Sequence, residues 1–110
     1  MNDERAAAGL DELVWDPALA EIAGAWSTKM AGAGGLAHNP DLADQVTPVA
    51  PAWQRLGENV GTGSSVDELH AAFMASDGHR RNILGDFERI GVGVEVTNGR
   101  VWVTVDFLQT

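Results

Sequence analysis

The 110-residue chain contains no cysteine, and this absence excludes several kinds of site at once. Without cysteine there is no disulfide, no thiolate-bound metal and no cysteine nucleophile. The chain also begins Met-Asn-Asp-Glu-Arg, which lacks the basic segment and apolar run of a secretory signal peptide. The missing cysteines fit a cytosolic protein and equally a bacterial protein that is secreted without disulfides. The missing signal peptide fits a protein that is not secreted, or a sequence from which the leader has been trimmed.

Basic residues are scarce: 7 Lys and Arg stand against 16 Asp and Glu, for a formal net charge of −9 at pH 7. This balance argues against nucleic acid as a partner and against anionic membrane surfaces, since both require a cationic protein surface. No apolar run approaches the ~20 residues of a membrane-spanning helix, so we expect no membrane span. Apolar residues make up 45% of the sequence, which is enough to build the core of one domain over residues 1–110.

Capping residues and apolar spacing predict the helices. Residues 2–8 form a short helix capped by Asn2 or Asp3. A second helix begins at Asp16, because Pro17 suits its first position, and one face of it carries Leu19, Ile22, Ala23, Trp26 and Met30.

A third helix opens at Ser65, which forms a capping box with Glu68, and its buried stripe is Val66, Leu69 and Phe73. Residues 76–84 break at Gly78 and restart as a short helix that Ser76 or Asp77 caps. Between the second and third helices, residues 36–56 have no clear period and are expected to be an irregular connection, followed by a short strand or turn at 57–60.

The carboxyl-terminal residues predict a β-hairpin that turns at Asn98-Gly99, since both positions tolerate positive φ. Pairing outward from the turn gives one apolar face with the pairs Val96–Val101, Val94–Val103, Val92–Val105 and Ile90–Phe107. The other face pairs Glu95 with Trp102, Gly93 with Thr104 and Gly91 with Asp106. The two glycines leave a shallow lane, in which another segment packs closely or Trp102 lies over Gly93. Helices that mostly precede the strands predict an α+β fold with an antiparallel sheet.

The spacing of the histidines alone does not indicate a metal site, because the sequence has no His-Glu-x-x-His pattern. Ser76 lies three residues before His79, but no nucleophile elbow surrounds it, so a helix cap is the better interpretation. Trp53 precedes the Gly-Glu-Asn sequence and either lines a cleft or packs in the core. Asn59 and Asn82 are interpreted as turn or cap residues.

Five motifs occur in a characteristic order: Leu36-Ala37-His38, Gly57-Glu58-Asn59-Val60, Ser76 to Leu84, Ile90 to Val94, and Val103 to Phe107. Together they resemble the bacterial branch of the CAP superfamily, the SCP-like extracellular proteins, over nearly the whole chain. The resemblance implies a three-layer α–β–α sandwich with a small central antiparallel sheet. It also implies a secreted or cell-envelope location, and a cleft where two histidines and two acidic residues meet, often with zinc or another divalent cation.

By this resemblance the two histidines are His38 and His79, and the acid of the Gly-Glu-Asn motif is Glu58. The second acid is missing, since its place falls near Ser76. Two imidazoles can bind zinc, but a catalytic zinc usually has three protein ligands, so the ion is expected to bind weakly. Glu58 is then a third ligand, a base acting on bound water, or a structural carboxylate hydrogen-bonded to backbone amides or to an imidazole.

Three functions follow as hypotheses. The first, which we favour, is a non-catalytic extracellular module that binds a ligand or partner and holds a divalent metal weakly between His38 and His79. The second is a metal-assisted hydrolase of peptide or cell-wall material, with Glu58 as general base. The third is a lipid or sterol carrier, for which residues 36–56 are the candidate wall of an apolar groove.

Overall fold

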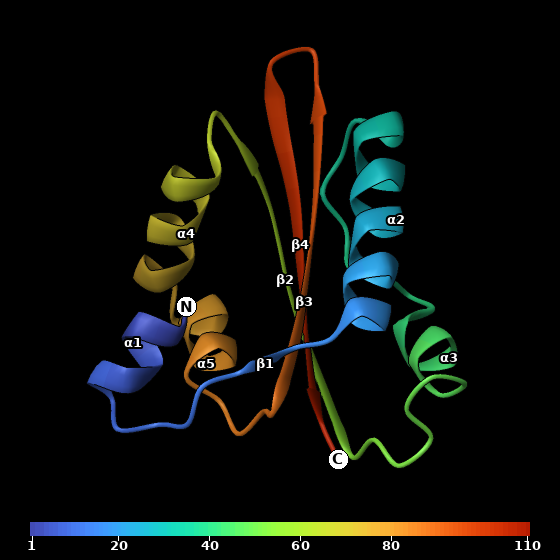
Figure 1. Ribbon diagram of the computed structural model, residues 1–110. Helices are drawn as coiled ribbons and strands as arrows, with labels where there is room; N and C mark the ends of the chain where they lie inside the picture. Colours follow the sequence, from blue (N-terminus) through green and yellow to red (C-terminus); the bar gives the residue numbers. More distant parts are fainter.

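A four-stranded sheet forms the centre of the computed structural model, which describes residues 1–110 (Figure 1). Strands β3 (Arg89–Thr97), β4 (Arg100–Gln109) and β2 (Arg55–Gly63) are neighbours in that order and run antiparallel. The two-residue strand β1 (Val14–Trp15) pairs in parallel with the start of β3. β2 is therefore one edge of the sheet, and most of β3 is the other.

Helices cover both faces of this sheet (Figure 1). On one face lie α2 (Pro17–Ala33) and the short α3 (Leu42–Val46). On the other face lie α1 (Asn2–Ala7), α4 (Val66–Ala75) and α5 (Asp77–Ile83). The predicted α+β class and α–β–α layering are confirmed, with β1 as a small parallel addition to the antiparallel sheet.

The β3–β4 hairpin has the predicted register. Val96 pairs with Val101, Gly93 with Thr104 and Gly91 with Asp106. The turn residues Asn98 and Gly99 have φ of 53° and 73°, the positive values that a two-residue hairpin turn of this type needs.

The backbone of α2 occupies the glycine lane of β3. A Cβ at Gly93 would stand 2.1 Å from Gly24 N, and a Cβ at Gly91 would stand 2.3 Å from Ala20 N. Trp102 does not fill the lane; it packs instead against Met30 and Val60. Only glycine lets the helix and the sheet approach this closely.

The buried face of α2 differs in part from the predicted stripe. Asp16 caps the helix as predicted, since its Oδ1 accepts hydrogen bonds from Ala18 N and Leu19 N. The fully buried positions, however, include Ser27, whereas Trp26 is only half-buried. The Ser27 hydroxyl forms hydrogen bonds with the sheet, at 3.0 Å from Gly93 O and 2.8 Å from Thr104 Oγ1.

The middle of the chain is more regular than predicted. Instead of a short strand at 57–60, β2 runs over nine residues and pairs with β4 along its whole length. Its glycines have little intrinsic β preference, so the strand depends on this long-range pairing. Gly57 and Gly61 lie beneath the rings of Phe87 and Phe73. The connection 36–56 contains α3, because Leu42 and Val46 bury themselves against α2 and β4.

Three predictions about helix ends were wrong. Asn2 does not cap α1; its side chain instead accepts from Leu13 N and donates to Leu13 O. The break between α4 and α5 lies at Ser76, and Gly78 lies inside α5. Ser65 accepts from Glu68 N as predicted, but the Glu68 carboxylate bonds the Ser64 hydroxyl, and Val66 is exposed.

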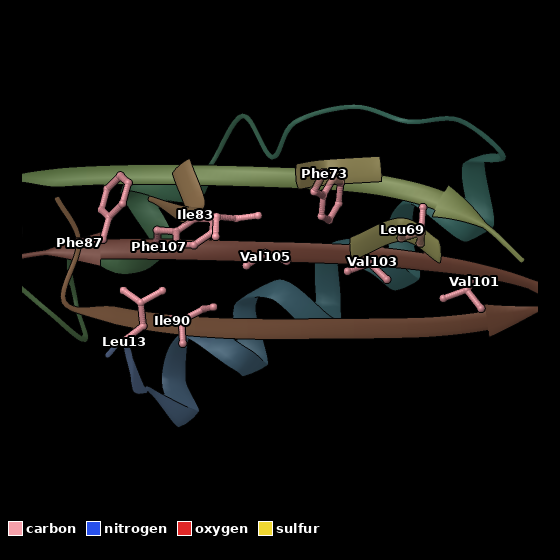
Figure 2. Close-up of a cluster of buried hydrophobic side chains, with 10 residues drawn as sticks. All are labelled: Leu13, Leu69, Phe73, Ile83, Phe87, Ile90, Val101, Val103, Val105 and Phe107. Carbon is pink, nitrogen blue, oxygen red and sulfur yellow. The ribbon is translucent and has the colours of Figure 1, made fainter. Parts of the chain in front are cut away.

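The main apolar core lies between the sheet and the α4–α5 layer (Figure 2). Its ten buried residues come from both ends of the chain and are Leu13, Leu69, Phe73, Ile83, Phe87, Ile90, Val101, Val103, Val105 and Phe107. The buried Arg5 closes one end of this layer by donating to the backbone oxygens of Asp11, Ile83, Gly85 and Phe87. This arginine joins the amino-terminal helix to the turn before β3, a role that no sequence pattern indicated.

The glycine lane makes the first testable prediction. Gly93→Ala forces a methyl group into the backbone of α2, so we expect a loss of about 3 kcal/mol or more in the free energy of unfolding, the upper end of overpacking effects. Gly32→Ala is the matched control, because nothing lies within 4 Å of its Cβ position in α2. It should gain up to about 1 kcal/mol from helix propensity. Urea unfolding measures both, and equal stability of the two variants would contradict the close approach.

Candidate functional site

His38 and Glu58, two of the residues that the resemblance assigns to the cleft, contact one another at the edge strand β2. The connection after α2 carries His38, and its Nδ1 lies 2.9 Å from Glu58 Oε1. The same oxygen accepts a hydrogen bond from Asn39 N at 2.9 Å. Because Oε1 accepts from a backbone amide, it acts as an acceptor, and His38 Nδ1 is the donor. Nε2 of His38 makes no hydrogen bond, and the ring is 68% exposed.

His79 occupies the first turn of α5 and has different partners. Its Nδ1 lies 2.9 Å from Ser76 Oγ, and its ring packs on Phe73 with centroids 4.9 Å apart. Ser76 stands at the N-cap position, but its hydroxyl engages this imidazole and caps no backbone amide. The His79 ring makes no hydrogen bond or ion pair with His38 or Glu58.

Two asparagines connect the segments that carry these residues. Asn59 is fully buried and donates to His79 O, and its own Oδ1 accepts from Asn82 Nδ2. Asn82 Nδ2 also reaches Glu58 O. The interpretation of both as turn or cap residues is therefore wrong. Their hydrogen bonds join α5 to β2 and hold the backbone of His79 next to Asn59.

Trp53 is half-buried and packs against core residues. It packs against the cluster of Leu19, Leu42, Val46, Ala50 and Leu108, and its Nε1 donates to Thr47 Oγ1 at 2.9 Å. In this position it holds the connection 36–56 against α2 and β4.

Asp106 is the residue of this region that the sequence analysis did not single out. It pairs with Glu58 across the β2–β4 ladder and with Gly91 across the hairpin. Since α2 covers Gly91, the Asp106 side chain lies under that helix and is 0% exposed. The alternation of the strand alone predicts that Asp106 faces solvent. Its pairing with Gly91, a glycine that a helix can cover, is the feature of the sequence that indicated burial.

The two carboxyl groups contain three buried oxygens without a hydrogen-bond donor: Glu58 Oε2 and both oxygens of Asp106. Two ionised carboxylates cannot bond to one another, because both only accept. Burial first, and then the neighbouring Glu58, raise the pKa of Asp106 to about 9. At neutral pH Asp106 is thus a neutral acid, and its proton is the donor that the pair otherwise lacks.

These contacts limit what metal site the chain can build. The structure contains no group of three or more His, Asp or Glu side chains placed to hold a metal ion. Glu58 orients His38, which is how carboxylates support metal-binding histidines from behind. The imidazole donors that these contacts leave are Nε2 of His38 and Nε2 of His79, whereas a catalytic zinc usually has three protein ligands.

The raised pKa of Asp106 predicts a dependence of stability on pH. The folded protein keeps a proton that the unfolded chain loses above the ordinary pKa of 3.8, so this contribution to stability declines from about pH 4 to about pH 9. In Asp106→Asn the amide can donate to Glu58 without a titrating proton, so its free energy of unfolding should fall less over this range. Urea unfolding at pH 5 to 9 measures the difference.

Asp11→Asn is the control for this experiment, since Asp11 is exposed and its side chain has no hydrogen-bond partner. Its profile should follow that of the wild type. Parallel profiles for the wild type and Asp106→Asn would show that no proton is held between the two carboxyls.

Comparison with known proteins identifies the family of this chain. The family model for CAP, the cysteine-rich secretory protein family, matches residues 1–107, although the chain has no cysteine. A Bacillus subtilis protein described as uncharacterized, YkwD, is 35% identical over 107 residues, covering 92% of this chain and 41% of that protein.

Solved structures agree with this match. An extracellular protein of Bacillus anthracis that contains an SCP domain superposes with a TM-score of 0.86 at 28% identity, covering 99% of this chain and 37% of that protein. An outer surface protein of Borrelia burgdorferi has a TM-score of 0.88, covering 98% and 85% of the two chains, and at 17% identity it shows the fold alone. The chain spans about two-fifths of the length of the two Bacillus proteins. It belongs to the CAP family, as a domain of the bacterial type.

Proposed function

We propose that this chain is a non-catalytic extracellular binding domain, and that His38 and His79 hold a divalent cation such as zinc weakly through their Nε2 atoms. The observation that carries the proposal is the double engagement of Glu58 Oε1, by His38 Nδ1 and by Asn39 N. A carboxylate in this position orients an imidazole and supports the backbone of the loop. Its role is to keep His38 Nε2 directed outward for a ligand.

The same contacts disfavour the metal-assisted hydrolase. A general base must reach a water molecule at the reacting centre. Glu58 Oε1 already accepts two hydrogen bonds, and Oε2 is buried opposite Asp106. The second acid of the family pattern is replaced near Ser76, whose hydroxyl engages His79. Glu58, the carboxylate that would act as the base in hydrolysis, is therefore engaged in structural contacts.

The lipid-carrier hypothesis loses the wall that was predicted for it. Leu42, Val46, Ala50 and the half-buried Trp53 of the connection 36–56 pack inward against α2 and β4. The largest pocket of the molecule lies on the opposite face of the sheet and includes no residue of this segment. Residues 36–56 thus form part of the core layer and leave no apolar groove of comparable size.

Location outside the cytoplasm belongs to the proposal. It is supported by relatives described as an extracellular protein and an outer surface protein. None of the helices in the structure has the length and apolar character needed to span a bilayer. The high acidic charge fits a partner that is neutral or basic.

Calorimetric titration with Zn²⁺ tests the metal part of the proposal. The wild type should bind one ion weakly, with a micromolar or larger Kd, because only two imidazoles are available. His38→Ala and His79→Ala should each abolish binding if one ion is shared. Glu58→Gln should weaken it by about 10-fold or more, since the amide orients His38 less well.

His70→Gln is the control, because His70 lies on α4 and bonds Glu4. Binding that survives in both His38→Ala and His79→Ala would refute the shared ion. Turnover of peptide or peptidoglycan by the zinc-saturated wild type, lost in Glu58→Gln, would overturn the non-catalytic assignment in favour of the hydrolase.

A further inference from the structure

The largest pocket of the molecule is an apolar groove of about 650 Å³ on the α4 side of the sheet. We call it the α1–α4 groove. Its lining residues come from the start of α1, from β1, from α4 and from the hairpin, and they are Met1, Asn2, Asp3, Trp15, Val66, Asp67, Leu69, His70, Phe73, Ile90, Val92, Val103 and Val105. It lies across the sheet from Asp106, so it is separate from the His38–Glu58 pair and an inference about it is independent of the proposed function.

The groove continues over a part of β3 that no helix covers. α4 packs on β2 and β4, and in Figure 2 its core residues Leu69 and Phe73 lie toward β2, away from β3. Along β3 the alternate residues after Val92 are therefore open: Val94 is 45% and Val96 is 64% exposed. Trp15 and Val66 at the borders of the groove are also exposed. Exposed apolar side chains that adjoin one another in this way mark an interaction surface.

The shape of the open surface fits an α-helix. On the opposite face, α2 packs on both β3 and β4, whereas on this face no helix packs to a similar extent on β3. The row from Ile90 to Val96 extends roughly 20 Å at ~3.3 Å per strand residue. A helix that follows this row needs about 13 residues at ~1.5 Å each. Alternating strand side chains with α4 beside them form a trough for the apolar face of such a helix.

The charge around the groove selects the partner. Asp3 and Asp67 stand at its rim, exposed and without a basic partner, while His70 is engaged by Glu4. The net charge of the chain is −9. A second copy would bring the same acidic rim against itself, and a fatty acid would bring its carboxylate near two others. A helix that flanks its apolar face with lysine or arginine complements both the floor and the rim.

We propose that the α1–α4 groove is a docking site for an amphipathic helix of a partner protein, with an apolar face seated on Val92, Val94 and Val96 and basic residues facing Asp3 and Asp67. Binding completes the helical layer over β3, as α2 completes the other face. The apolar contacts supply affinity, and the acidic rim supplies orientation and selects against anionic partners.

The probe is a 14-residue helical peptide with a leucine–alanine face and lysine flanks, labelled for fluorescence anisotropy. It should bind the full chain one-to-one. Val94→Asp should remain folded, because Val94 is half-exposed, and should weaken binding by at least tenfold. Val49→Asp is the matched control at an exposed valine near α3 and should change nothing. Asp3→Asn combined with Asp67→Asn should weaken binding several-fold and flatten its dependence on salt.

Two further peptides separate the proposal from general attraction to an acidic protein. A scrambled peptide of identical composition, without an apolar face, and a peptide with glutamate flanks should both fail to bind. The proposal is overturned if no peptide binds, if the scrambled peptide binds equally, or if Val94→Asp and Val49→Asp behave alike. It is also overturned if the acidic chain dimerises through this face in sedimentation, or if a neutral sterol occupies the groove and excludes the peptide.

Discussion

The close approach of α2 to the sheet at Gly91 and Gly93 is the constraint on which the rest of this structure depends. A helix whose backbone nearly touches a strand leaves no room for water between them. Every polar group of the sheet beneath α2 must therefore find its partner inside the protein. Ser27 and Thr104 do so by bonding to each other. Asp106, two residues after Thr104 on the same face of β4, has no such neighbour except another acid.

That acid connects the packing of the core to the surface histidine. Asp106 stays protonated because it is buried and faces Glu58. Glu58 belongs to the same buried carboxyl pair, and its Oε1 bonds Asn39 N and His38 Nδ1. The exposed imidazole is thereby held at its Nδ1 edge against Glu58, on a ring that is 68% exposed. The buried carboxyl pair under α2 thus adjoins the surface histidine through Glu58.

Local signals in the sequence predicted what depends on neighbours in the chain, and not what depends on distant ones. The hairpin register followed from Asn98-Gly99 and the alternation around it, and the start of α2 followed from Asp16 and Pro17. β2 was predicted too short, because a glycine-rich strand forms through its pairing with β4. The resemblance assigned His38, Glu58 and His79 to one cleft, and the structure brings the first two into contact. The roles of Asp106 and Arg5 come from burial by segments far away in sequence, which local patterns do not indicate.

Helices pack on the two faces of the sheet at different distances, and the two faces therefore expose different side chains. Under α2 the glycines of β3 bring the backbones of helix and strand close together. Under the shorter α4 and α1, larger side chains hold the helices off, so that part of β3 keeps an apolar surface open. Consecutive residues of β4 serve the two faces, with Val105 in the groove and Asp106 beside Glu58. Because neighbouring strand residues point in opposite directions, a ligand on either face contacts no side chain of the other. Any coupling between the faces would have to pass through the backbone of β4, whose side chains are buried on both sides from Val101 to Leu108 and leave it little freedom to shift.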